Sequence, residues 1–330
     1  MNATVIGTGG WGTALAVLLR GNGCHVRLWG RLEEEVGPIL ATRENKLLLP
    51  GVRVPDEIAV TLDDAAALSG AEMVVLAVPS HGMRTICSRL RPNIPAGALL
   101  VHVAKGIENE TAKRMSEVVL EELRRDDVVV LSGPSHAEEV ARGVPTALVA
   151  ASVYETRAVQ AQDIFMNERF RVYTHDDVAG VEFGGAMKNV VALAAGLCDG
   201  IGFGDNTKAA LCTRGLAEMT RLGLARGARA ETFSGLSGLG DLMVTAFSRH
   251  SRNRKFGERL GKGETVQQIQ ASTKAVAEGV RTVKSVQQLA HRCGVEMPIA
   301  REVYAIIYAG KSPRQAVRDL MTREAKPEFD

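Results

Sequence analysis

Short apolar runs alternate with stretches of helical periodicity through about the first 150 residues of the chain. The apolar runs are rich in β-branched residues, as buried strands are, and they are Ala3–Ile6, His25–Trp29, Met73–Val78, Leu99–Val103, Val128–Leu131 and Ala147–Ala150. Between them, Trp11–Arg20 and Thr111–Leu123 repeat apolar residues with the period of an α-helix. Strands that alternate with helices in this way predict an α/β fold with a doubly wound, mostly parallel sheet.

The strand pattern ends after about Val181, and the preceding Phe170–Tyr173 is compatible with a last strand. Long Ala- and Leu-rich helical patterns follow, in Met187–Leu197, Lys208–Leu222, Val276–Arg292 and Ile299–Ile307. A chain of 330 residues also exceeds one ordinary domain. We therefore expect a sheet domain in residues 1–180 and an all-helical C-terminal domain in residues 181–330.

Two segments stand apart from these patterns. The closely spaced Gly235, Gly238 and Gly240, together with the basic run Arg249–Lys255, predict an unusual loop. The polar end, Arg323–Asp330, predicts a loose tail.

Composition restricts the class of protein without identifying it. The chain is 45% hydrophobic and 24% charged, with a formal net charge of +2, which argues against a nucleic-acid binder driven by bulk charge. Its five cysteines are widely spaced, without a C-x-x-C pair or a zinc-ligand pattern, so we expect buried thiols, a reducing compartment and no metal site. We find no signal-peptide pattern and no apolar run long enough to span a bilayer, and expect a cytoplasmic protein.

A glycine-rich turn follows the first predicted strand and opens the first predicted helix. Gly7, Gly9 and Gly12 fit the G-x-G-x-x-G pattern, in which the glycines permit a tight turn, let the backbone approach a pyrophosphate and allow close helix packing. The amides at the start of the helix then face the anion. The turn predicts a Rossmann-type domain that binds a dinucleotide, and the alternative is a purely structural glycine turn.

The second predicted strand ends at a residue that would meet the adenosine ribose. An acidic residue there accepts from the ribose 2′-hydroxyl of NAD, whereas Arg31 can pair with a 2′-phosphate. Arg31 therefore favours NADP (NADPH) over NAD, although a solvated arginine is the alternative. Glu33–Glu35 come slightly late for the acidic role and keep NAD open.

Four segments concentrate the groups that carbonyl reduction on a phosphorylated substrate requires, namely a proton donor, cations and amides. They are Val103–Gly106, Leu131–Ala137, Gly185–Val190, and Gly238–Leu242 with Ser251–Arg254. Lys188 is the most informative residue, because its helical neighbours are apolar. Desolvation and a second cation such as Lys105 would lower its pKa and suit it to acid/base catalysis, unless it extends to water instead.

Other polar residues compete for these roles. His102, His136 and His175 are alternative proton donors, each more typical of a structural histidine, and His250 could belong to a solvated basic loop. Asp241 could hold the Lys188 ammonium or cap a helix. Lys105 and Arg252 could supply the cations that a phosphate dianion needs.

The motifs together resemble those of the bacterial NAD(P)+-dependent glycerol-3-phosphate dehydrogenase family. The resemblance runs in order through most of the chain and rests on Gly7–Gly12, Val103–Gly106, Ser132–Ser135, Lys188–Asn189, Gly238–Asp241 and Ser251–Arg254. Smaller agreements are Leu49–Pro50, Pro145–Ala147 and Val276–Gly279. Gly10, where serine is common, and Ala246, where cysteine often follows Thr245, depart from the pattern without removing a charged group.

The resemblance implies reversible hydride transfer between NAD(P)H and dihydroxyacetone phosphate, giving sn-glycerol 3-phosphate for glycerophospholipid synthesis, by a homodimer. It implies that Lys188 accepts the proton in oxidation and donates it in reduction. Substrate contacts on this view are Lys105, Gly133, Ser135, Lys188, Asn189, Asp241, Ser251, Arg252 and Asn253. Cofactor contacts are Gly7, Gly9, Gly10, Trp11, Gly12, Arg31, Lys105, Ala137, Arg252, Val276 and Glu278.

Two other interpretations stay open at this point. A related dehydrogenase of hydroxyacids or hydroxyacyl thioesters would be favoured by a catalytic histidine in the first helix of the second domain, where this chain has Lys188–Asn189. A nucleotide-sensing regulator would bind NADP without chemistry. The buried-looking lysine and the absence of a nucleic-acid-binding pattern argue against the regulator.

Overall fold

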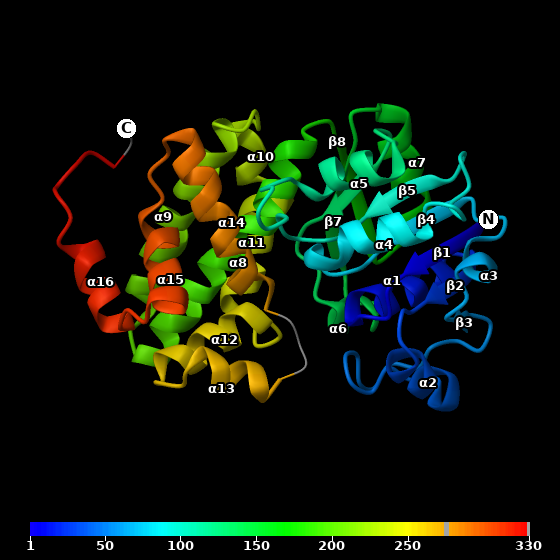
Figure 1. Cartoon of the computed structure of the whole chain (residues 1–330), viewed down its shortest axis with the longest axis horizontal. Helices are drawn as coiled ribbons and strands as arrows, with labels where there is room; N and C mark the ends of the chain where they lie inside the picture. The colour runs from blue at the N-terminus through cyan, green and yellow to red at the C-terminus, as the bar shows by residue number, and fades with distance from the viewer. Residues whose placement is uncertain (274–276, 329–330) are drawn as a thin grey trace.

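The computed structural model describes residues 1–273 and 277–328, which form a sheet domain and a helical domain side by side (Figure 1). The N-terminus lies at the outer side of the sheet domain, and the C-terminal helices lie at the opposite end of the molecule. Val276, one of the predicted cofactor contacts, lies outside the described residues.

One eight-stranded sheet forms the core of the first domain, in the order β3-β2-β1-β4-β5-β6-β7-β8. Its strands are β1 (Asn2–Ile6), β2 (His25–Trp29), β3 (Ala59–Thr61), β4 (Met73–Leu76), β5 (Leu99–His102), β6 (Val129–Ser132), β7 (Thr146–Ala151) and β8 (Phe170–His175). All neighbours are parallel except β6 and β7, which are antiparallel. The predicted mostly parallel Rossmann-type sheet is confirmed, and its first six strands have the dinucleotide-binding order.

The register brings the carboxyl ends of the central strands to one edge. Ile6 at the end of β1 lies beside Trp29 of β2 and Leu76 of β4, and Leu76 lies beside His102 of β5. In open parallel sheets, ligands bind at this edge, where the strand order reverses about β1 and β4.

The connections of the sheet domain are short helices. They are α1 (Gly10–Gly21), α2 (Glu33–Thr42), α3 (Asp64–Leu68), the 3₁₀ turn η1 (Ser80–Gly82), α4 (Met83–Leu90), α5 (Met115–Leu123), α6 (Ala137–Val140) and α7 (Glu155–Phe165). The predicted helix over Thr111–Leu123 is too long at its start. Glu110 and Ala112 have positive φ angles and Ile107 bridges Arg114, so a turn occupies the first residues.

The second domain, as far as the structure describes it, is helical, as predicted. Its elements are α8 (Val178–Ile201), α9 (Asp205–Leu224), α10 (Ala230–Ser234), the π-helical turn η2 (Leu236–Gly240), α11 (Asp241–Phe247), α12 (Arg252–Gly261), α13 (Val266–Ala271), α14 (Glu278–Cys293), α15 (Pro298–Ala309) and α16 (Pro313–Met321). The predicted loop over Arg249–Lys255 is wrong beyond Ser251, because Ser251 caps α12 through its side chain and Arg252 begins the helix.

Helix α8 is the centre of this domain, and α9, α11, α12 and α14 pack around it. Its crossing with α12 is close because glycines on both helices face backbone. A Cβ on Gly196 would lie 1.9 Å from the carbonyl oxygen of Arg254, and one on Gly257 would lie 2.0 Å from that of Leu193. Any side chain at these positions would push the helices apart and displace the start of α12.

The expectation that no apolar segment is long enough to span a bilayer is wrong for α8. Among the described residues this helix has the length and composition to cross a membrane, but its apolar window is entirely buried inside the protein. Its burial identifies it as the core helix of the domain.

Helix α8 also joins the two cores. Val178 and Val181 in its first turn pack against Val130, Val149 and Ala151 of the sheet. The predicted domain boundary between residues 180 and 181 therefore falls inside a helix that belongs to both packing units, and it stays a prediction.

Candidate active site

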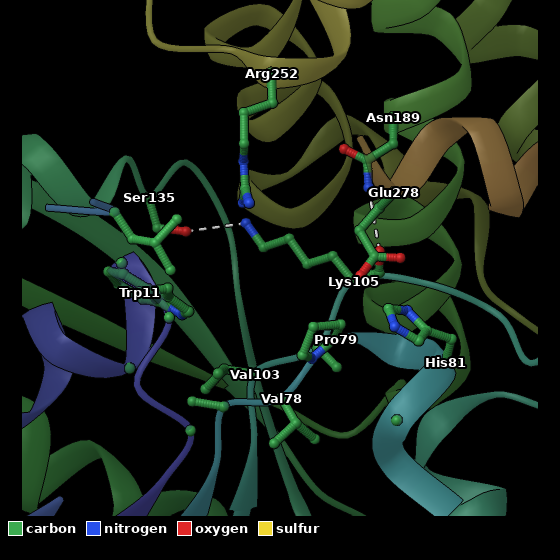
Figure 2. Close-up of a pocket in the computed structure, with 18 of the residues that line it drawn as sticks. Trp11, Val78, Pro79, His81, Val103, Lys105, Ser135, Asn189, Arg252 and Glu278 are labelled. Carbon is green, nitrogen blue, oxygen red and sulfur yellow. Dashed lines mark hydrogen bonds between the residues drawn. The ribbon is translucent and has the colours of Figure 1, made fainter. Parts of the chain in front are cut away.

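A cavity of about 600 Å³ lies between the two domains at the carboxyl edge of the sheet (Figure 2). The predicted site residues that line it are Gly7, Gly9, Gly10, Trp11, Gly12, Arg31, Lys105, Ser135, Lys188, Asn189, Asp241, Ser251, Arg252, Asn253 and Glu278. Gly133 and Ala137 are not among its lining residues. The fold therefore brings together segments from both domains around one space.

The glycine-rich turn between β1 and α1 requires its glycines for two different reasons. Gly7 has a φ of +118°, and a Cβ there would lie 2.5 Å from the Ala77 carbonyl oxygen. A Cβ on Gly12 would lie 2.1 Å from the Gly7 carbonyl oxygen. Gly9, in contrast, would meet nothing within 4 Å, so its backbone faces open space. This geometry fits a dinucleotide whose pyrophosphate approaches Gly9 and the amides that begin α1.

Gly10 lies against the backbone of another segment. A Cβ at Gly10 would lie 2.6 Å from the Leu48 carbonyl oxygen and 3.8 Å from the Ala137 Cβ. Asn45 holds this segment in place, since its side-chain amide donates to the Thr8 carbonyl oxygen at 2.8 Å. The absence of a side chain at Gly10 therefore lets the chain around Leu48 lie directly against the glycine-rich turn.

Arg31 and Glu35 both line the end of the cavity beyond β2. Arg31 and the acidic run Glu33–Glu35 were the candidates that the sequence offered for contact with the cofactor ribose. Arg31 is exposed and makes no hydrogen bond or ion pair within the part of the chain that the structure describes. Glu35 lines the same end and accepts a hydrogen bond from the Thr8 hydroxyl at 3.2 Å. A free guanidinium here can bind a 2′-phosphate, and the carboxylate can accept from a ribose hydroxyl.

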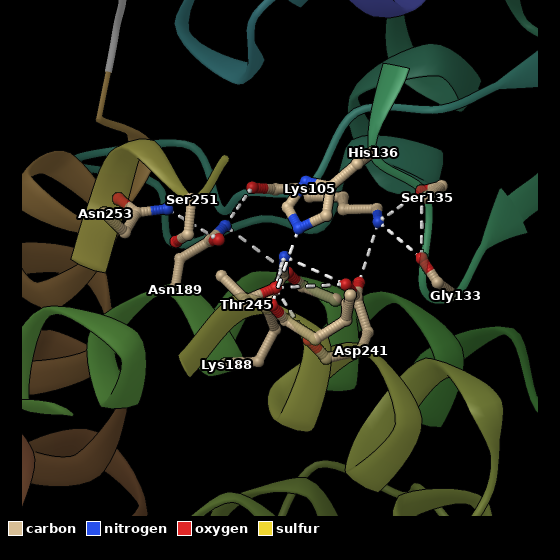
Figure 3. Close-up of polar contacts among 12 residues, drawn as sticks. Lys105, Gly133, Ser135, His136, Lys188, Asn189, Asp241, Thr245, Ser251 and Asn253 are labelled. Carbon is tan, nitrogen blue, oxygen red and sulfur yellow. Dashed lines mark hydrogen bonds and ion pairs between the residues drawn. The ribbon is translucent and has the colours of Figure 1, made fainter. Parts of the chain in front are cut away.

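Lys188 projects from α8 into a polar cluster and is 6% exposed (Figure 3). Its Nζ lies 3.0 Å from Asp241 Oδ1 and donates to Thr245 Oγ1 at 2.6 Å. Burial lowers the pKa of Lys188 to about 8, because its loss of hydration outweighs the attraction of Asp241 and because Lys105 adds repulsion. A lysine with such a pKa can exchange a proton near neutral pH.

Asp241 holds two lysines with its two carboxylate oxygens. Oδ2 accepts from Lys105 Nζ at 2.7 Å, and Lys105 also donates to the Gly133 carbonyl oxygen at 2.7 Å and to Ser135 Oγ at 2.9 Å. Burial would raise the pKa of Asp241, but the ammoniums of Lys105 and Lys188 outweigh it and hold the pKa below its usual value. The side chain does not cap a helix, so the alternative of a capping aspartate is wrong.

A chain of amides connects the cluster to α12 and α14. Asn189 Nδ2 donates to the Lys105 carbonyl oxygen at 3.2 Å, and Asn253 Nδ2 donates to Asn189 Oδ1 at 2.8 Å. Asn253 Oδ1 accepts in turn from the Gly279 amide at 2.9 Å. These bonds fix Asn189 relative to Lys105 across the domain boundary.

The start of α12 offers an anion site beside the lysines. Arg252 is exposed to the cavity in the first helical turn and makes no hydrogen bond with any residue in the described ranges. Ser251 caps the helix by accepting from the Arg254 amide at 3.1 Å. The helix N-terminus and the guanidinium of Arg252 can together receive a phosphate group.

Thr245 is the residue of this cluster that the sequence reasoning missed. Its hydroxyl donates to the Asp241 carbonyl oxygen at 2.6 Å while accepting from Lys188. Thr245 lies four residues after Asp241, so a helix predicted over this segment would have placed both on one face.

Two of the histidines that the sequence analysis considered as alternative proton donors or basic-loop residues also line the cavity. His136 comes from the sheet domain and His250 from the helical domain, with ring centroids 5.7 Å apart. Burial, and then Lys188, lower the pKa of His136 below its usual value. His102 is instead fully buried near Glu182 and does not line this cavity.

A dinucleotide-binding turn that faces a buried, acid/base-competent lysine across a domain boundary defines a class of protein, the two-domain nicotinamide-dependent dehydrogenases. The model of the N-terminus of NAD-dependent glycerol-3-phosphate dehydrogenase matches residues 2–158, and that of the C-terminus matches residues 177–318. The chain therefore belongs to the NAD-dependent glycerol-3-phosphate dehydrogenase family.

Individual relatives agree with this assignment. The chain is 51% identical over 329 residues to glycerol-3-phosphate dehydrogenase [NAD(P)+] of Pelotomaculum thermopropionicum, covering 99% of this chain and 94% of the relative. It is likewise 51% identical to the enzyme of that name from Moorella thermoacetica, covering 99% and 97%. The crystal structure of glycerol-3-phosphate dehydrogenase from Coxiella burnetii is 37% identical, with a TM-score of 0.94 over 98% of this chain and 99% of that one.

A more distant structure shows how far the fold extends. A ketopantoate reductase from Ralstonia eutropha has a TM-score of 0.63 at 17% identity, covering 96% of this chain and all of that one, and shares the fold alone. The predicted family, the fold and the class of NAD(P)-dependent oxidoreductase are confirmed.

Proposed function

We propose that this chain catalyses reversible hydride transfer between NAD(P)H and dihydroxyacetone phosphate, forming sn-glycerol 3-phosphate for glycerophospholipid synthesis in the cytoplasm. One observation carries the proposal: Asp241 pairs with both Lys188 and Lys105 at the wall of the interdomain cavity. The homodimer implied by the family resemblance is part of the same proposal.

The nicotinamide cofactor supplies a hydride to the ketone carbon when it is bound. The protein must then meet the negative charge that develops on the ketone oxygen. Lys188 in its ammonium form donates the proton to this oxygen and becomes a neutral amine, while Asp241 and Thr245 hold its Nζ in place. In the oxidation direction the neutral amine accepts the proton from the alcohol.

The remaining polar groups of the cavity would orient the substrate. Arg252 and the N-terminus of α12 would bind the phosphate dianion, because the guanidinium makes no hydrogen bond with any described residue and a helix N-terminus is positively polarised. Lys105, held by Gly133 and Ser135, and Asn189 would contact the three-carbon backbone. The proposed substrate contacts are thus Lys105, Gly133, Ser135, Lys188, Asn189, Asp241, Ser251, Arg252 and Asn253.

The cofactor would lie along the glycine-rich turn with its adenosine towards Arg31. Because Arg31 has no partner among the described residues, we propose NADPH as the preferred cofactor, with NAD accepted less well. Proposed cofactor contacts are Gly7, Gly9, Gly10, Trp11, Gly12, Arg31, Lys105, Ala137, Arg252, Val276 and Glu278.

The test is oxidation of NADPH and NADH by the purified chain, followed by loss of nicotinamide absorbance. Dihydroxyacetone phosphate should support rapid turnover, whereas unphosphorylated dihydroxyacetone, 2-keto acids and 3-ketoacyl thioesters should not. Equal or faster turnover with any of the last three would contradict the proposed substrate.

A further inference from the structure

Glu182, in the first turns of α8, carries a buried carboxylate that does not line the interdomain cavity. Oε1 accepts a hydrogen bond from the Ser116 amide at 2.8 Å and lies 3.1 Å from His102 Nε2. Oε2 accepts hydrogen bonds from Ser116 Oγ and from Arg114 Nη1, each at 2.6 Å. These partners belong to the end of β5 and the start of α5, so Glu182 ties α8 to two elements of the sheet domain.

The charge of Glu182 makes these contacts costly to separate. Burial would raise the pKa of this carboxyl, but His102, Arg114 and Ser116 outweigh burial and lower the pKa to about 2. Glu182 is therefore ionised at neutral pH, and a buried charge that loses a partner is strongly unfavourable. The carboxylate thus holds the start of α8 in one position on the sheet domain.

The face of α8 that carries Glu182 continues to the acid/base site. Glu182, Gly185 and Asn189 recur at the spacing of one helix face. A Cβ on Gly185 would lie 3.6 Å from Lys105 Cγ, and the Asn189 side chain donates to the Lys105 carbonyl oxygen at 3.2 Å. Since Lys105 closely follows His102 in the chain, this face of α8 runs along the end of β5 and the segment after it.

We propose that Glu182 is a positioning residue for the acid/base site, acting through its contact with His102. The contact sets where α8 lies along the end of β5, and thereby places Lys188 and Lys105 at the two carboxylate oxygens of Asp241 (Figure 3). Even a small displacement of groups that act in catalysis costs large factors in rate. The inference rests on the proposed function, and it gives His102 a role that differs from that of a proton donor.

The pH dependence of turnover distinguishes positioning from a purely structural role. Lys188 is faced by Asp241 from α11, Lys105 from the segment after β5, Arg252 from α12 and His136 from the sheet domain. Of these four groups, Lys105 is the one that follows β5. When Lys105 moves away, its repulsion of Lys188 falls and Asp241 pairs with Lys188 alone, so the pKa of Lys188 rises. The decline of ketone reduction at high pH should then move to higher pH.

His102→Leu is the decisive variant, because it removes the β5 side of the contact and leaves Glu182 its bonds to Arg114 and Ser116. We expect turnover of dihydroxyacetone phosphate to fall roughly 10- to 100-fold, with little change in NADPH affinity. The pH profile should move up by roughly half a unit or more. His102→Gln keeps an N–H donor for the carboxylate and should recover much of both. Glu182→Gln keeps the size of the side chain, removes the charge and should reproduce the His102→Leu result.

Glu302→Gln is the matched control for the loss of a buried carboxylate. Glu302 lies on α15, is 6% exposed like Glu182, and pairs with Lys311 without lining the cavity. This variant should lower the melting temperature and leave turnover and the pH profile as in the wild type.

Turnover, its pH profile and the melting temperature are measured together for each folded variant. Wild-type turnover in the His102→Leu and Glu182→Gln proteins would overturn the inference alone. A fall in turnover with an unmoved pH profile would overturn it too, because it would indicate a general loosening of the fold. A wild-type protein that does not reduce dihydroxyacetone phosphate would overturn the proposed function as well.

Discussion

Lys188 and Asp241 form a buried ion pair in which Lys188 Nζ lies 3.0 Å from Asp241 Oδ1. Lys188 lies on α8 and Asp241 is the first residue of α11, so the two residues come from helices that are not consecutive in the chain. The aspartate shares its charge with a second lysine, Lys105, at 2.7 Å. One carboxylate therefore balances two ammoniums, and this arrangement decides how readily Lys188 gives up a proton.

Replacing Lys188 by methionine keeps the bulk of the side chain and removes the proton donor. We expect turnover to fall by roughly 10²–10⁴-fold, the usual scale for general acid/base catalysis, with little change in NADPH affinity. Lys208→Met is the matched control, because Lys208 is also buried but pairs with Asp199 outside the cavity. A folded Lys188→Met protein with near-normal turnover at every pH would show that Lys188 is not the proton donor, and Lys105 would then be the candidate for that role.

The pH dependence of turnover should follow the pKa of Lys188, which burial lowers to about 8. Ketone reduction needs the ammonium and should decline as the pH rises through about 8, whereas alcohol oxidation needs the neutral amine and should increase over the same range.

Asp241→Asn removes the charge that raises the pKa of Lys188 and leaves Lys105 to repel Lys188. Both profiles should then move to lower pH by roughly one unit or more. Profiles that stay in place would show that another group titrates.

Cofactor preference should depend on Arg31. Arg31→Asp places a carboxylate where a 2′-phosphate would lie, so we expect the Michaelis constant for NADPH to rise roughly 10- to 100-fold. The Michaelis constant for NADH should change little, because its 2′-hydroxyl can donate to the new carboxylate. Steady-state kinetics with both cofactors measures the difference, and an equal response of the two would remove Arg31 from 2′-phosphate recognition.

Recognition of the substrate phosphate should depend on Arg252. Arg252→Ala should raise the Michaelis constant for dihydroxyacetone phosphate by roughly 10- to 100-fold. Slow turnover of unphosphorylated dihydroxyacetone should be affected much less. Arg249→Ala, which removes an exposed arginine that does not line the cavity, is the control. Losses of the same size on both ketones would indicate a different role for Arg252.

Stability should also depend on pH through a carboxyl group outside the active site. Burial raises the pKa of Glu218 to about 7, although the amides of Ile299 and Ala300 donate to it at 2.6 Å and 3.2 Å. The folded protein then holds this proton more tightly than the unfolded chain. Protonated Glu218 therefore contributes fully to the stability of the fold below about pH 4.5, and this contribution is lost as the pH rises to about 7. The free energy of unfolding should fall by about 3 kcal/mol over this range.

Glu218→Gln removes this titration and should flatten the dependence of the melting temperature on pH between about 4.5 and 7. Glu231→Gln, which changes an exposed glutamate on α10, should leave the dependence as in the wild type. An unchanged slope in the Glu218 variant would assign the effect to another group.

Local pattern was enough to predict most of the sheet and its helices. The strand His25–Trp29 has the predicted bounds, and the compatible segment Phe170–Tyr173 lies within β8. The short β3 (Ala59–Thr61) was missed, because three residues carry too little pattern to distinguish a strand from a turn. The bounds of α5 were misplaced for a similar reason, since backbone turns before Met115 leave no periodic signal.

The sequence by itself determined the glycine-rich turn, the order of strands and helices, and the residue types available for chemistry, because these depend on local sterics and on periodic burial. The tertiary structure alone decided that Lys105 would pair with the carboxylate of Asp241, 136 residues away in the chain. It also decided that Glu278 would accept a hydrogen bond from Ser80, 198 residues away. Such contacts arise from how α8, α11 and α14 pack on the sheet. The lowered pKa of Lys188 depends on the burial and charges that this packing creates.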